Sequence, residues 1–268
     1  VTAWMDAGEA YYWDTYVDGN GRVCPYIVVA EGHTREEVVD MVLPEVVNDQ
    51  TMKYIPFDFL GMELYGGKKG LCGDDQKLND LNIETLQLPA TIEAIGLDGN
   101  PFIWAGGDIE IEFLGDINTI ELGKDVLNHF YNKGYLEYSW NINADGISIV
   151  VPADCDPETI YDVVIPSTFG GKTVTSIAWD LLGARKGWDG RQGLCVKDEG
   201  GDWGDPHCAV ESITFPKTIT TIQNEPFYFG AGIEEFKFEE GMNVTEAWKA
   251  CLGYCPANEK WAKEHDGF

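Results

Sequence analysis

The chain has 268 residues, of which 44% are hydrophobic and 24% are charged, and its formal net charge is −28. This length and composition predict a folded chain with a sizeable core, as one elongated domain or two domains of roughly 130 residues, and they exclude disorder. The acidic balance argues against nucleic-acid partners, because its field repels phosphate backbones, and no apolar run reaches the ~18 residues that a membrane-spanning helix needs.

Each half of the chain opens with an alternating aromatic stretch that ends in a turn signal. Residues 11–17 precede Asp18-Gly19-Asn20-Gly21, and residues 138–142 precede Asp145-Gly146. An Asp-Gly pair between alternating runs is a strong hairpin signal. We therefore expect β-hairpins over 11–29 and 137–151.

A shorter pattern follows each hairpin: an apolar residue, two others, an apolar residue, one other, an apolar residue, and often Pro. Side chains two apart on a strand share a face, so each copy predicts a short strand with an apolar pair pointing inward. Pro cannot donate to a sheet ladder and ends the strand. The copies are Val38-Met41-Leu43-Pro44, Ile83-Leu86-Leu88-Pro89, Ile160-Val163-Ile165-Pro166 and Val210-Ile213-Phe215-Pro216, with weaker copies at Ile111-Phe113 and Ile233-Phe236-Phe238.

The spacing of these copies predicts coils of leucine-rich-repeat type. Their central apolar positions, 41, 86, 111, 163, 213 and 236, lie 45, 25, 52, 50 and 23 residues apart. The short spacings match one coil of about 20–29 residues. We interpret each long spacing as two coils, one of them occupied by the hairpin or by an irregular insertion. A second apolar pair after each Pro predicts a second extended segment: Met52 and Ile55, Ile92 and Ile95, Val174 and Ile177, Ile219 and Ile222.

The two halves of the chain repeat each other. Segment 41–55 aligns with 163–177, and segment 86–95 aligns with 213–222, at offsets of 122 and 127 residues. A fixed period of this kind indicates the duplication of one module. We expect two tandem modules, 1–132 and 133–268, in one continuous solenoid. A generic antiparallel β-sandwich with chance spacing is the alternative.

Several segments resemble the BspA-like leucine-rich repeats of bacterial cell-surface proteins. VVIPSTFGGKTVTSI (163–177) resembles the opening of the family's repeat, and VESITFPKTITTI (210–222) resembles its next coil. Residues 136–151 are similar to the hairpin that precedes such arrays, and residues 255–268 resemble the terminal helix that closes them. Only Ala250-Cys251-Leu252 matches the family's usual small-Cys turn.

The resemblance covers 136–268 most closely. It implies a mainly β, right-handed leucine-rich-repeat solenoid with irregular or short helical connections and a C-terminal capping helix. It also implies a protein that is secreted or held at the surface of a bacterium, that binds a protein or host-matrix partner, and that has no catalytic activity. The chain opens at Val1 without a signal peptide, and this start decides nothing about compartment.

Two insertions rich in Gly and charge, 61–80 and 183–207, are longer than an ordinary coil connection. Trp188 and Trp203 lie in the second insertion, where aromatic rings are explained as ligand contacts or as a small separate core. We predict a binding site there that includes Asp189, Arg191 and Asp202. Trp179, in contrast, follows a predicted strand and is expected to pack in the core.

Acidic side chains in the second insertion raise the question of calcium. Asp198, Asp202 and Asp205 could collect oxygen ligands, as could Asp18-Gly19-Asn20 or Gly73-Asp74-Asp75, but none follows the EF-hand spacing and solvated turns are the alternative. Seven cysteines and four scattered histidines contain no pair of Cys-x-x-Cys motifs, which argues against structural zinc. No other cofactor is expected.

The odd number of cysteines leaves at least one thiol free or intermolecular. Cys195 and Cys208 bracket the second insertion, and a disulfide between them would close a short loop. Cys251 and Cys255 could pair across the final turn. Buried thiols are the alternative for both pairs.

The sequence contains no Gly-x-Ser-x-Gly, P-loop or His-Glu-x-x-His motif. His207 and Cys208 are neighbours, and neighbours on a strand point to opposite faces. We therefore expect a non-enzymatic extracellular binding or adhesion module. The alternatives are a carbohydrate-binding or glycan-processing accessory domain, and a structural spacer of a larger surface protein.

Overall fold

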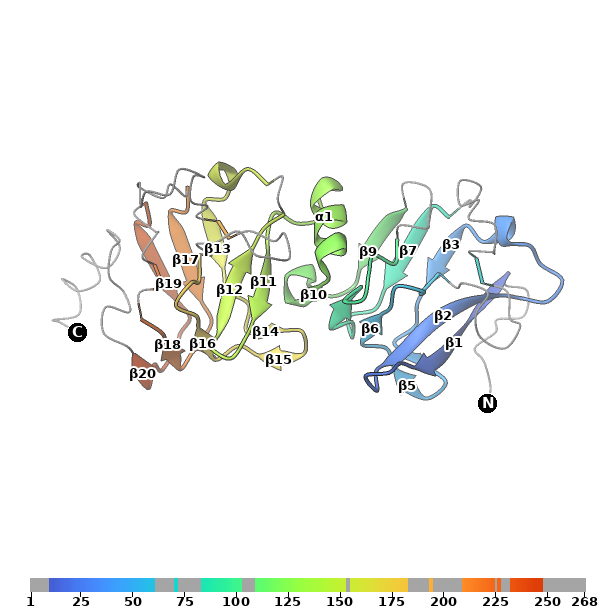
Figure 1. The fold of residues 1–268 in the computed structure, drawn as a ribbon, viewed down its shortest axis with the longest axis horizontal. Helices are drawn as coiled ribbons and strands as arrows, with labels where there is room; N and C mark the ends of the chain where they lie inside the picture. The colour runs from blue at the N-terminus through green and yellow to red at the C-terminus, as the bar shows by residue number, and fades with distance from the viewer. Residues whose placement is uncertain are drawn as a thin grey trace. The chain divides into compact units, whose positions relative to one another are not determined.

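The computed structural model describes residues 10–60, 70–71, 83–102, 109–152, 155–182, 193–194, 209–224, 226–227 and 232–247. The chain divides into two compact units, Val1–Val126 and Leu127–Phe268, and each is described here by itself. The described part is mainly β, and its one α-helix, α1 (Lys124–Asn132), begins in the first unit and ends in the second (Figure 1). The module boundaries 1–132 and 133–268 stay a prediction.

The first unit contains ten short strands and two 3-10 helices in its described part. They are β1 (Tyr11–Val17), β2 (Val23–Val29), η1 (Arg35–Glu37), β3 (Asp40–Val42), β4 (Val46–Val47), β5 (Gln50–Thr51), β6 (Tyr54–Ile55), β7 (Thr85–Leu88), β8 (Ala94–Ile95), β9 (Glu110–Phe113), η3 (Ile117–Thr119) and β10 (Glu121–Leu122).

The described part of the second unit has strands in the same order, with one 3-10 helix after its hairpin and none between its last two strands. They are β11 (Ser139–Ile142), β12 (Ile147–Val150), η4 (Pro157–Thr159), β13 (Asp162–Val164), β14 (Thr168–Phe169), β15 (Lys172–Thr173), β16 (Ser176–Ile177), β17 (Ser212–Phe215), β18 (Thr221–Ile222), β19 (Glu235–Phe238) and β20 (Glu246–Ala247).

Both predicted hairpins are confirmed. Strands β1 and β2 pair antiparallel, with Tyr11 opposite Val29, and β11 pairs with β12 in the same way. The first turn is built by Asp18, whose carboxylate accepts the backbone N–H groups of Asn20 and Arg22. In the second turn, the side chain of Asn143 accepts the N–H of Asp145. Short polar side chains of this kind stabilise turns by bonding to backbone two residues on.

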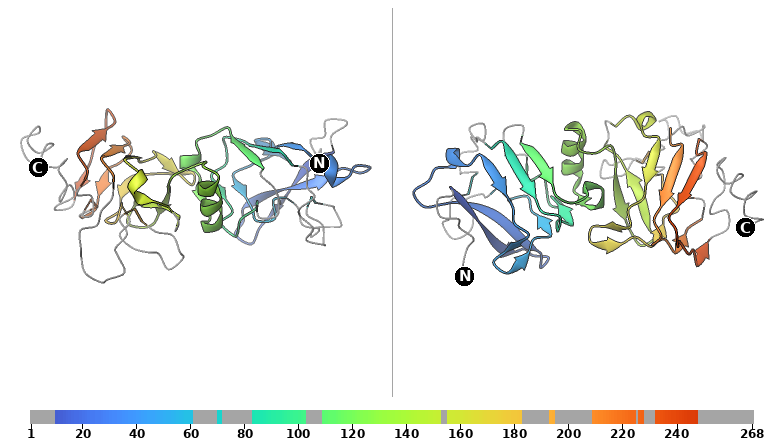
Figure 2. Two further views of the ribbon diagram at one scale, coloured as in Figure 1. Left: turned by 90° about the horizontal axis from the view of Figure 1, so that it is seen from above. Right: turned by 180° about the vertical axis from the view of Figure 1, so that it is seen from behind.

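Parallel sheets follow each hairpin, and the chain alternates between two of them. In the first unit, β3-β7-β9 form one sheet and β6-β8-β10 the other (Figure 1). In the second unit, β13-β17-β19 form one sheet, and β16-β18-β20 the other, which the hairpin extends through a parallel pair of β12 with β16. Figure 2 shows the strands of each sheet side by side from two further directions.

The residues predicted to be central in each coil are register partners. Met41 lies opposite Leu86, and Leu86 lies opposite Ile111. The second unit pairs Val163 with Ile213 and Ile213 with Phe236 in the same manner. The apolar pairs of the copies that end in Pro point inward as expected, since Met41, Leu43, Leu86 and Leu88 are at most 2% exposed. The expectation is wrong for Phe238 in the weaker copy, which is 37% exposed on β19, at the edge of its sheet. The second extended segments are confirmed as β6, β8, β16 and β18.

The interpretation of the long spacings as two coils is wrong for 41 to 86 and for 163 to 213. The strands at these positions are hydrogen-bonded neighbours, so only one coil separates them and its connection carries the insertion. The physical reason is that the entropic cost of closing a loop rises slowly with its length. A long surface insertion therefore leaves the pairing of its flanking strands intact.

Trp179 is not a core residue, contrary to the expectation. Its side chain is 44% exposed, whereas Ile177 and Ala178 before it and Leu181 and Leu182 after it are buried. The chain turns directly after Ile177, so the next inward positions fall to the two leucines. The backbone N–H of Ile149 on the hairpin donates to the carbonyl of Leu181 at 2.7 Å, which holds this turn against the core.

In each unit, a small hairpin with a two-residue turn lies between the first strands of the two parallel sheets, that is, between β3 and β6 and between β13 and β16. Strand β4 pairs with β5, and β14 pairs with β15. The turn residues have positive φ angles: 50° at Asn48, 62° at Asp49, 55° at Gly170 and 71° at Gly171. Two positive φ angles in succession are the type I′ pattern, which Asn, Asp and Gly tolerate best.

Helix α1 was not predicted, although its sequence carries the signal. Val126, Leu127 and Phe130 lie on one face and are at most 1% exposed, which is the i, i+1, i+4 spacing of an amphipathic helix. The helix ends before Gly134, whose φ is +74°. The N–H groups of Gly134 and Tyr135 donate to the carbonyls of Tyr131 and Phe130, as in a Schellman cap.

Within the described ranges, no helix is long and apolar enough to cross a membrane. The expected terminal helix at 255–268 lies outside the described residues, as do the insertions 61–80 and 183–207 except for residues 70–71 and 193–194.

Candidate functional site

The binding residues predicted from sequence lie outside the described residues. They are Trp188, Asp189, Arg191, Asp202 and Trp203; the same holds for the calcium candidates Asp198 and Asp205 and for the cysteines Cys195, Cys208, Cys251 and Cys255. The predicted site in 183–207 and the predicted disulfides therefore stay predictions.

One leucine of each insertion is described, and its backbone bonds to the core of the same unit. The N–H of Leu194 donates to the carbonyl of Leu182 at 2.7 Å, and Leu71 makes the same bond to Leu60 at 3.0 Å. Both Leu71 and Leu194 are fully buried. Leu71 and Leu194 are thus each fixed to the core of their own unit.

Two aromatic side chains cover the outer edge of β3. Val39 and Leu43 make their backbone hydrogen bonds toward β7, so Asp40 and Val42, which alternate with them, direct N–H and C=O away from that strand. The N–H of Val42 donates to the Tyr11 hydroxyl at 3.0 Å, and the Val42 carbonyl accepts the indole N–H of Trp13 at 2.8 Å. The side chains of β1 therefore satisfy backbone groups that an uncovered edge strand leaves unpaired.

The second unit has one of these two bonds. The N–H of Val164 donates to the Tyr138 hydroxyl at 3.1 Å, and the Tyr138 and Trp140 rings meet edge to face at 5.6 Å, much as Tyr11 and Trp13 do at 5.9 Å. Trp140, however, is 2% exposed and its indole nitrogen has no hydrogen-bond partner among the described residues. A tyrosine hydroxyl therefore bonds to the edge strand in both units, whereas the tryptophan bond is found in the first unit only, among the described residues.

A groove of about 570 Å³ runs beside this edge in the first unit. Its walls are Ala10 to Trp13 from the start of β1, and Glu37 to Asp40, Val42 and Pro44 from η1 and β3. Tyr11 and Tyr12 are partly exposed, and Val42 is 51% exposed. The groove thus combines aromatic rings, apolar side chains and two carboxylates. The aromatic sequence at the start of β1 predicts a hairpin and does not indicate this groove.

Polar side chains stand in register on the outer faces of sheets β3-β7-β9 and β13-β17-β19. Asp40, Thr85 and Glu110 are register partners, and the Thr85 hydroxyl donates to Asp40 at 2.6 Å. Two residues along each strand, Gln87 donates to Glu112 at 2.8 Å. In the second unit, Ser212 bonds to Asp162, and the Lys237 ammonium bonds to the Ser212 hydroxyl at 2.9 Å. These side chains bridge neighbouring strands and present a mostly acidic surface.

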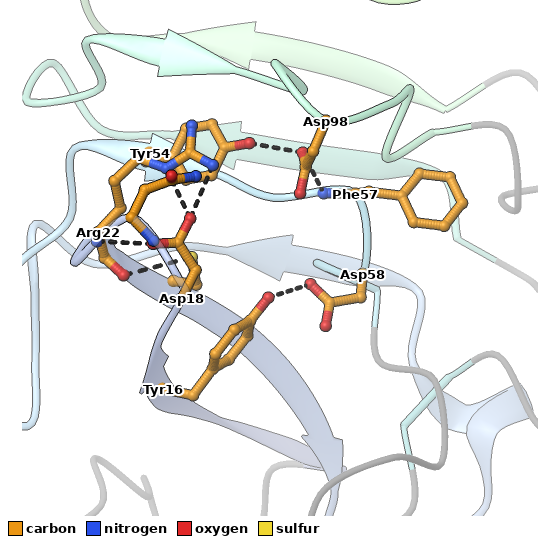
Figure 3. A network of polar contacts seen from close by, with 9 residues as sticks. Tyr16, Asp18, Arg22, Tyr54, Phe57, Asp58 and Asp98 are labelled. Atoms are coloured by element: carbon orange, nitrogen blue, oxygen red, sulfur yellow. Dashed lines mark hydrogen bonds and ion pairs between the residues drawn. The ribbon is translucent and has the colours of Figure 1, made fainter.

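A polar network surrounds the first hairpin turn (Figure 3). Arg22 pairs with the Asp18 carboxylate at 2.7 Å, and its guanidinium lies over the Tyr54 ring at 3.9 Å. Desolvation raises the pKa of Asp18, but the hydrogen bonds from Arg22 and Asn20 outweigh it and hold this pKa below its usual value. The stacked, paired guanidinium fastens the turn to β6, because a cation over an aromatic face is attracted to it.

Two tyrosines of this network donate to aspartates. The Tyr16 hydroxyl donates to Asp58 at 2.6 Å, and the Tyr54 hydroxyl donates to Asp98 at 2.5 Å (Figure 3). Burial first, and then the neighbouring aspartate, raises the pKa of each phenol well above its usual range. Both tyrosines therefore remain protonated donors at neutral pH and act as structural links between the hairpin, β6 and the segment after β8.

The calcium alternative at Asp18-Gly19-Asn20 finds no support in this geometry. The Asp18 carboxylate accepts two backbone N–H groups and the Arg22 guanidinium, so a cation already occupies its side. In the part of the chain that the structure describes, no group of three or more His, Cys, Asp or Glu side chains could hold a metal ion.

Cys24 and Cys155 are the two cysteines among the described residues, and both are free thiols. This confirms that at least one thiol is unpaired. Cys24 is fully buried beside the polar network, and burial raises its pKa to about 11. A thiol this protonated is a poor nucleophile, because the thiolate is the reactive form.

Among solved structures, the chain is similar to the leucine-rich repeat protein TpLRR of T. pallidum, with a TM-score of 0.32 and 12% identity over 96% of this chain and 94% of that chain. It is also similar to a leucine-rich cell surface protein from Faecalibacterium prausnitzii A2-165, with a TM-score of 0.25 and 13% identity over 96% of this chain and 55% of that chain. No protein-family model matches the chain, and no curated protein sequence matches it.

Proposed function

We propose that the chain is a non-enzymatic extracellular binding module that recognises a protein or host-matrix partner. The observation that carries this proposal is the outer face of sheet β3-β7-β9, where polar side chains of three parallel strands stand in register. Strands in a sheet are about 4.8 Å apart, so Asp40, Thr85 and Glu110 form a closely spaced row. A rigid array of this kind binds a large partner with little ordering cost.

The proposed scaffold is a right-handed leucine-rich-repeat solenoid of two tandem modules, 1–132 and 133–268. The alternation of the chain between two parallel sheets in each unit supports the coiled path. The matching bonds from Val42 to Tyr11 and from Val164 to Tyr138 support a common origin of the modules. The handedness, and a location in secretions or at a bacterial surface, rest on the resemblance to BspA-like repeats.

Specificity is proposed to reside partly in the insertion 183–207, with Trp188, Trp203, Asp189, Arg191 and Asp202 as contacts. Loops held by a rigid scaffold are common places for recognition. The bond of Leu194 to Leu182 supports this assignment, since it anchors the insertion to the core. Calcium at Asp198, Asp202 and Asp205 is a separate prediction, which calorimetric titration with calcium tests.

A second candidate function is carbohydrate binding. It is favoured by two exposed aromatic side chains of the second unit, Tyr161 at 52% and Trp179 at 44%. An exposed ring of this size is apolar on its face and polar at its edge, which suits a sugar ring. A structural spacer of a larger surface protein binds neither class of ligand.

The test is a binding screen with the full chain immobilised, against extracellular-matrix proteins and against a glycan array. Three paired variants locate the site: Glu110→Gln with Glu112→Gln on the sheet, Trp188→Ala with Trp203→Ala in the insertion, and Tyr161→Ala with Trp179→Ala in the second unit. The control, Asp49→Asn with Glu121→Gln, changes the same charge outside sheet β3-β7-β9.

We expect binding to at least one matrix protein, weakened by the sheet pair, by the insertion pair or by both, and unchanged in the control. Binding to glycans alone, lost in the Tyr161 and Trp179 pair, would establish the second candidate. A chain that binds nothing in either screen would favour the spacer and overturn the proposal.

A further inference from the structure

We propose that the groove between β1 and the outer edge of β3 binds a basic, extended segment of a protein partner, with Lys or Arg side chains against its aromatic and acidic lining. This inference rests on the proposed binding function and names the partner chemistry of one site. At about 570 Å³ the groove has the size of a ligand pocket, which usually measures some 300–1,000 Å³.

The backbone at the groove limits how a segment can bind. Asp40 and Val42 direct their backbone groups away from β7, toward the side on which β1 lies. Tyr11 and Trp13 already pair the N–H and C=O of Val42. A partner strand therefore cannot add to β3 across Val42, because its backbone would compete with these two side chains. Side-chain contacts must supply most of the affinity, in contrast to recognition by strand addition.

The charge of the lining selects a cationic side chain. Glu37 and Asp40 both line the groove and are exposed, whereas the described residues of the lining include no Lys, Arg or His. One Asp40 oxygen accepts the Thr85 hydroxyl, and Glu37 pairs with His33 at 2.6 Å. The chain as a whole carries a net charge of −28, so its field also draws a basic partner toward the groove.

The remaining lining suits the long stem of Lys or Arg. Val42 is 51% exposed, and Val39 and Pro44 are partly exposed beside it. Methylene stems of basic side chains pack on such apolar surface while the charged head stays near carboxylates and water. Tyr11 adds its ring on the opposite wall, and a guanidinium near a tyrosine ring gains about 0.5–1 kcal/mol at an exposed site.

The corresponding edge of the second unit lacks part of this lining. The 3-10 helix η4 ends in Thr159 where η1 ends in Glu37, so one carboxylate is missing. We therefore assign the basic segment to the first unit, and Glu37→Thr converts its groove toward the second unit's composition.

The experiment is isothermal titration calorimetry of the full chain with short end-blocked peptides of alternating Arg and Val. A peptide with citrulline in place of Arg keeps the shape and removes the charge, and a peptide with Glu reverses the charge. The groove variant is Glu37→Gln with Asp40→Asn, both exposed, and the matched control is Asp49→Asn with Glu121→Gln on the same unit.

We expect the Arg peptide to bind, and its Kd to rise about fivefold to tenfold in the groove variant, as two exposed charge contacts predict. The control variant changes the Kd less than about twofold. The citrulline peptide binds as weakly to the native chain as the Arg peptide binds to the groove variant.

Equal weakening by the groove variant and its control would overturn the proposal, because the general acidic field would then explain the binding. Equal affinity for the Glu or citrulline peptide would overturn it as well. Self-association of the chain that disappears in the groove variant would make a second copy the occupant. Loss of matrix binding in the Glu110 and Glu112 pair, with peptide binding retained, would locate the matrix site elsewhere and leave the groove assignment standing.

Discussion

The indole N–H of Trp13 donates a 2.8 Å hydrogen bond to the backbone carbonyl of Val42. Together with the Tyr11 hydroxyl, which accepts the N–H of the same valine, it pairs both backbone groups of Val42 at the outer edge of β3. Trp140 stands at the matching place in the second unit, where its buried indole nitrogen has no partner within the described ranges. The pair of tryptophans thus offers a comparison of one side chain with and without its hydrogen bond.

Trp13→Phe should lower the free energy of unfolding by about 1–2 kcal/mol more than Trp140→Phe does. Both changes remove similar ring area, but only the first breaks a hydrogen bond and leaves the Val42 carbonyl without that donor, whereas the second removes an unsatisfied buried N–H. Urea unfolding of both variants measures the difference. Equal losses would mean that the bond to Val42 contributes nothing net.

The Asp18 carboxyl should titrate below 3.8, its ordinary pKa, and Arg22→Met should raise this pKa. Desolvation acts in the opposite direction, so the hydrogen bonds and the ion pair from Arg22 and the N–H of Asn20 must account for the depression. Carbon-detected NMR titration of the Asp18 carboxyl measures both values.

The depressed pKa has a consequence for stability. Because the native state binds the Asp18 proton more weakly than the unfolded chain does, this group stabilises the protein above pH 3.8, and its contribution is lost as pH falls through the native pKa. Asp18→Asn should therefore destabilise the chain at pH 7 and have a smaller effect near pH 3. A stability difference that does not change with pH would contradict the linkage.

Cys24 should resist alkylation in the native chain. Its side chain is fully buried and its pKa is raised to about 11, so at pH 8 very little thiolate is present and no reagent can reach it. Iodoacetamide treatment followed by peptide mapping should find Cys24 unmodified without denaturant and fully modified in urea. Cys155, which is partly exposed, serves as the internal comparison and should react first. Rapid native labelling of Cys24 would contradict its burial.

Gly146→Ala should destabilise the second unit by about 1–3 kcal/mol more than Gly134→Ala does. Gly146 has a φ of +137°, and a Cβ there would lie 2.5 Å from the carbonyl oxygen of Ser176 on β16. Gly134→Ala is the matched control, because Gly134 also has positive φ, at +74°, but open space around it. It should cost only the strain of that backbone angle, about 1 kcal/mol. Thermal unfolding compares the two, and similar losses would mean that the contact with β16 relaxes.

Local patterns in the sequence predicted a large part of the fold. The inward positions of the short strands, such as Met41, Leu86 and Ile111, follow from the two-residue alternation of apolar side chains, which depends on nothing beyond the strand itself. The Asp-Gly signals located both hairpins. The type I′ turns at Asn48-Asp49 and Gly170-Gly171 carry an equally local signal, since only residues that tolerate positive φ fit there.

The candidate sites were not accessible in this way. Trp13 and Val42 are 29 residues apart, and Tyr54 and Asp98 are 44 apart, so no periodicity connects them. Trp179 shows the same limit, because its exposure depends on Leu181 and Leu182 filling the core beside it.

The sequence by itself determined which face of most of the short strands is apolar and where the hairpins turn, because neighbouring residues carry both signals. The tertiary structure alone decided that Met41 pairs directly with Leu86 across an insertion, that aromatic side chains of β1 cover the edge of β3, and that acids and tyrosines line a groove there. The reason is that pairing between distant strands sets the contacts, and a long connection costs little more than a short one.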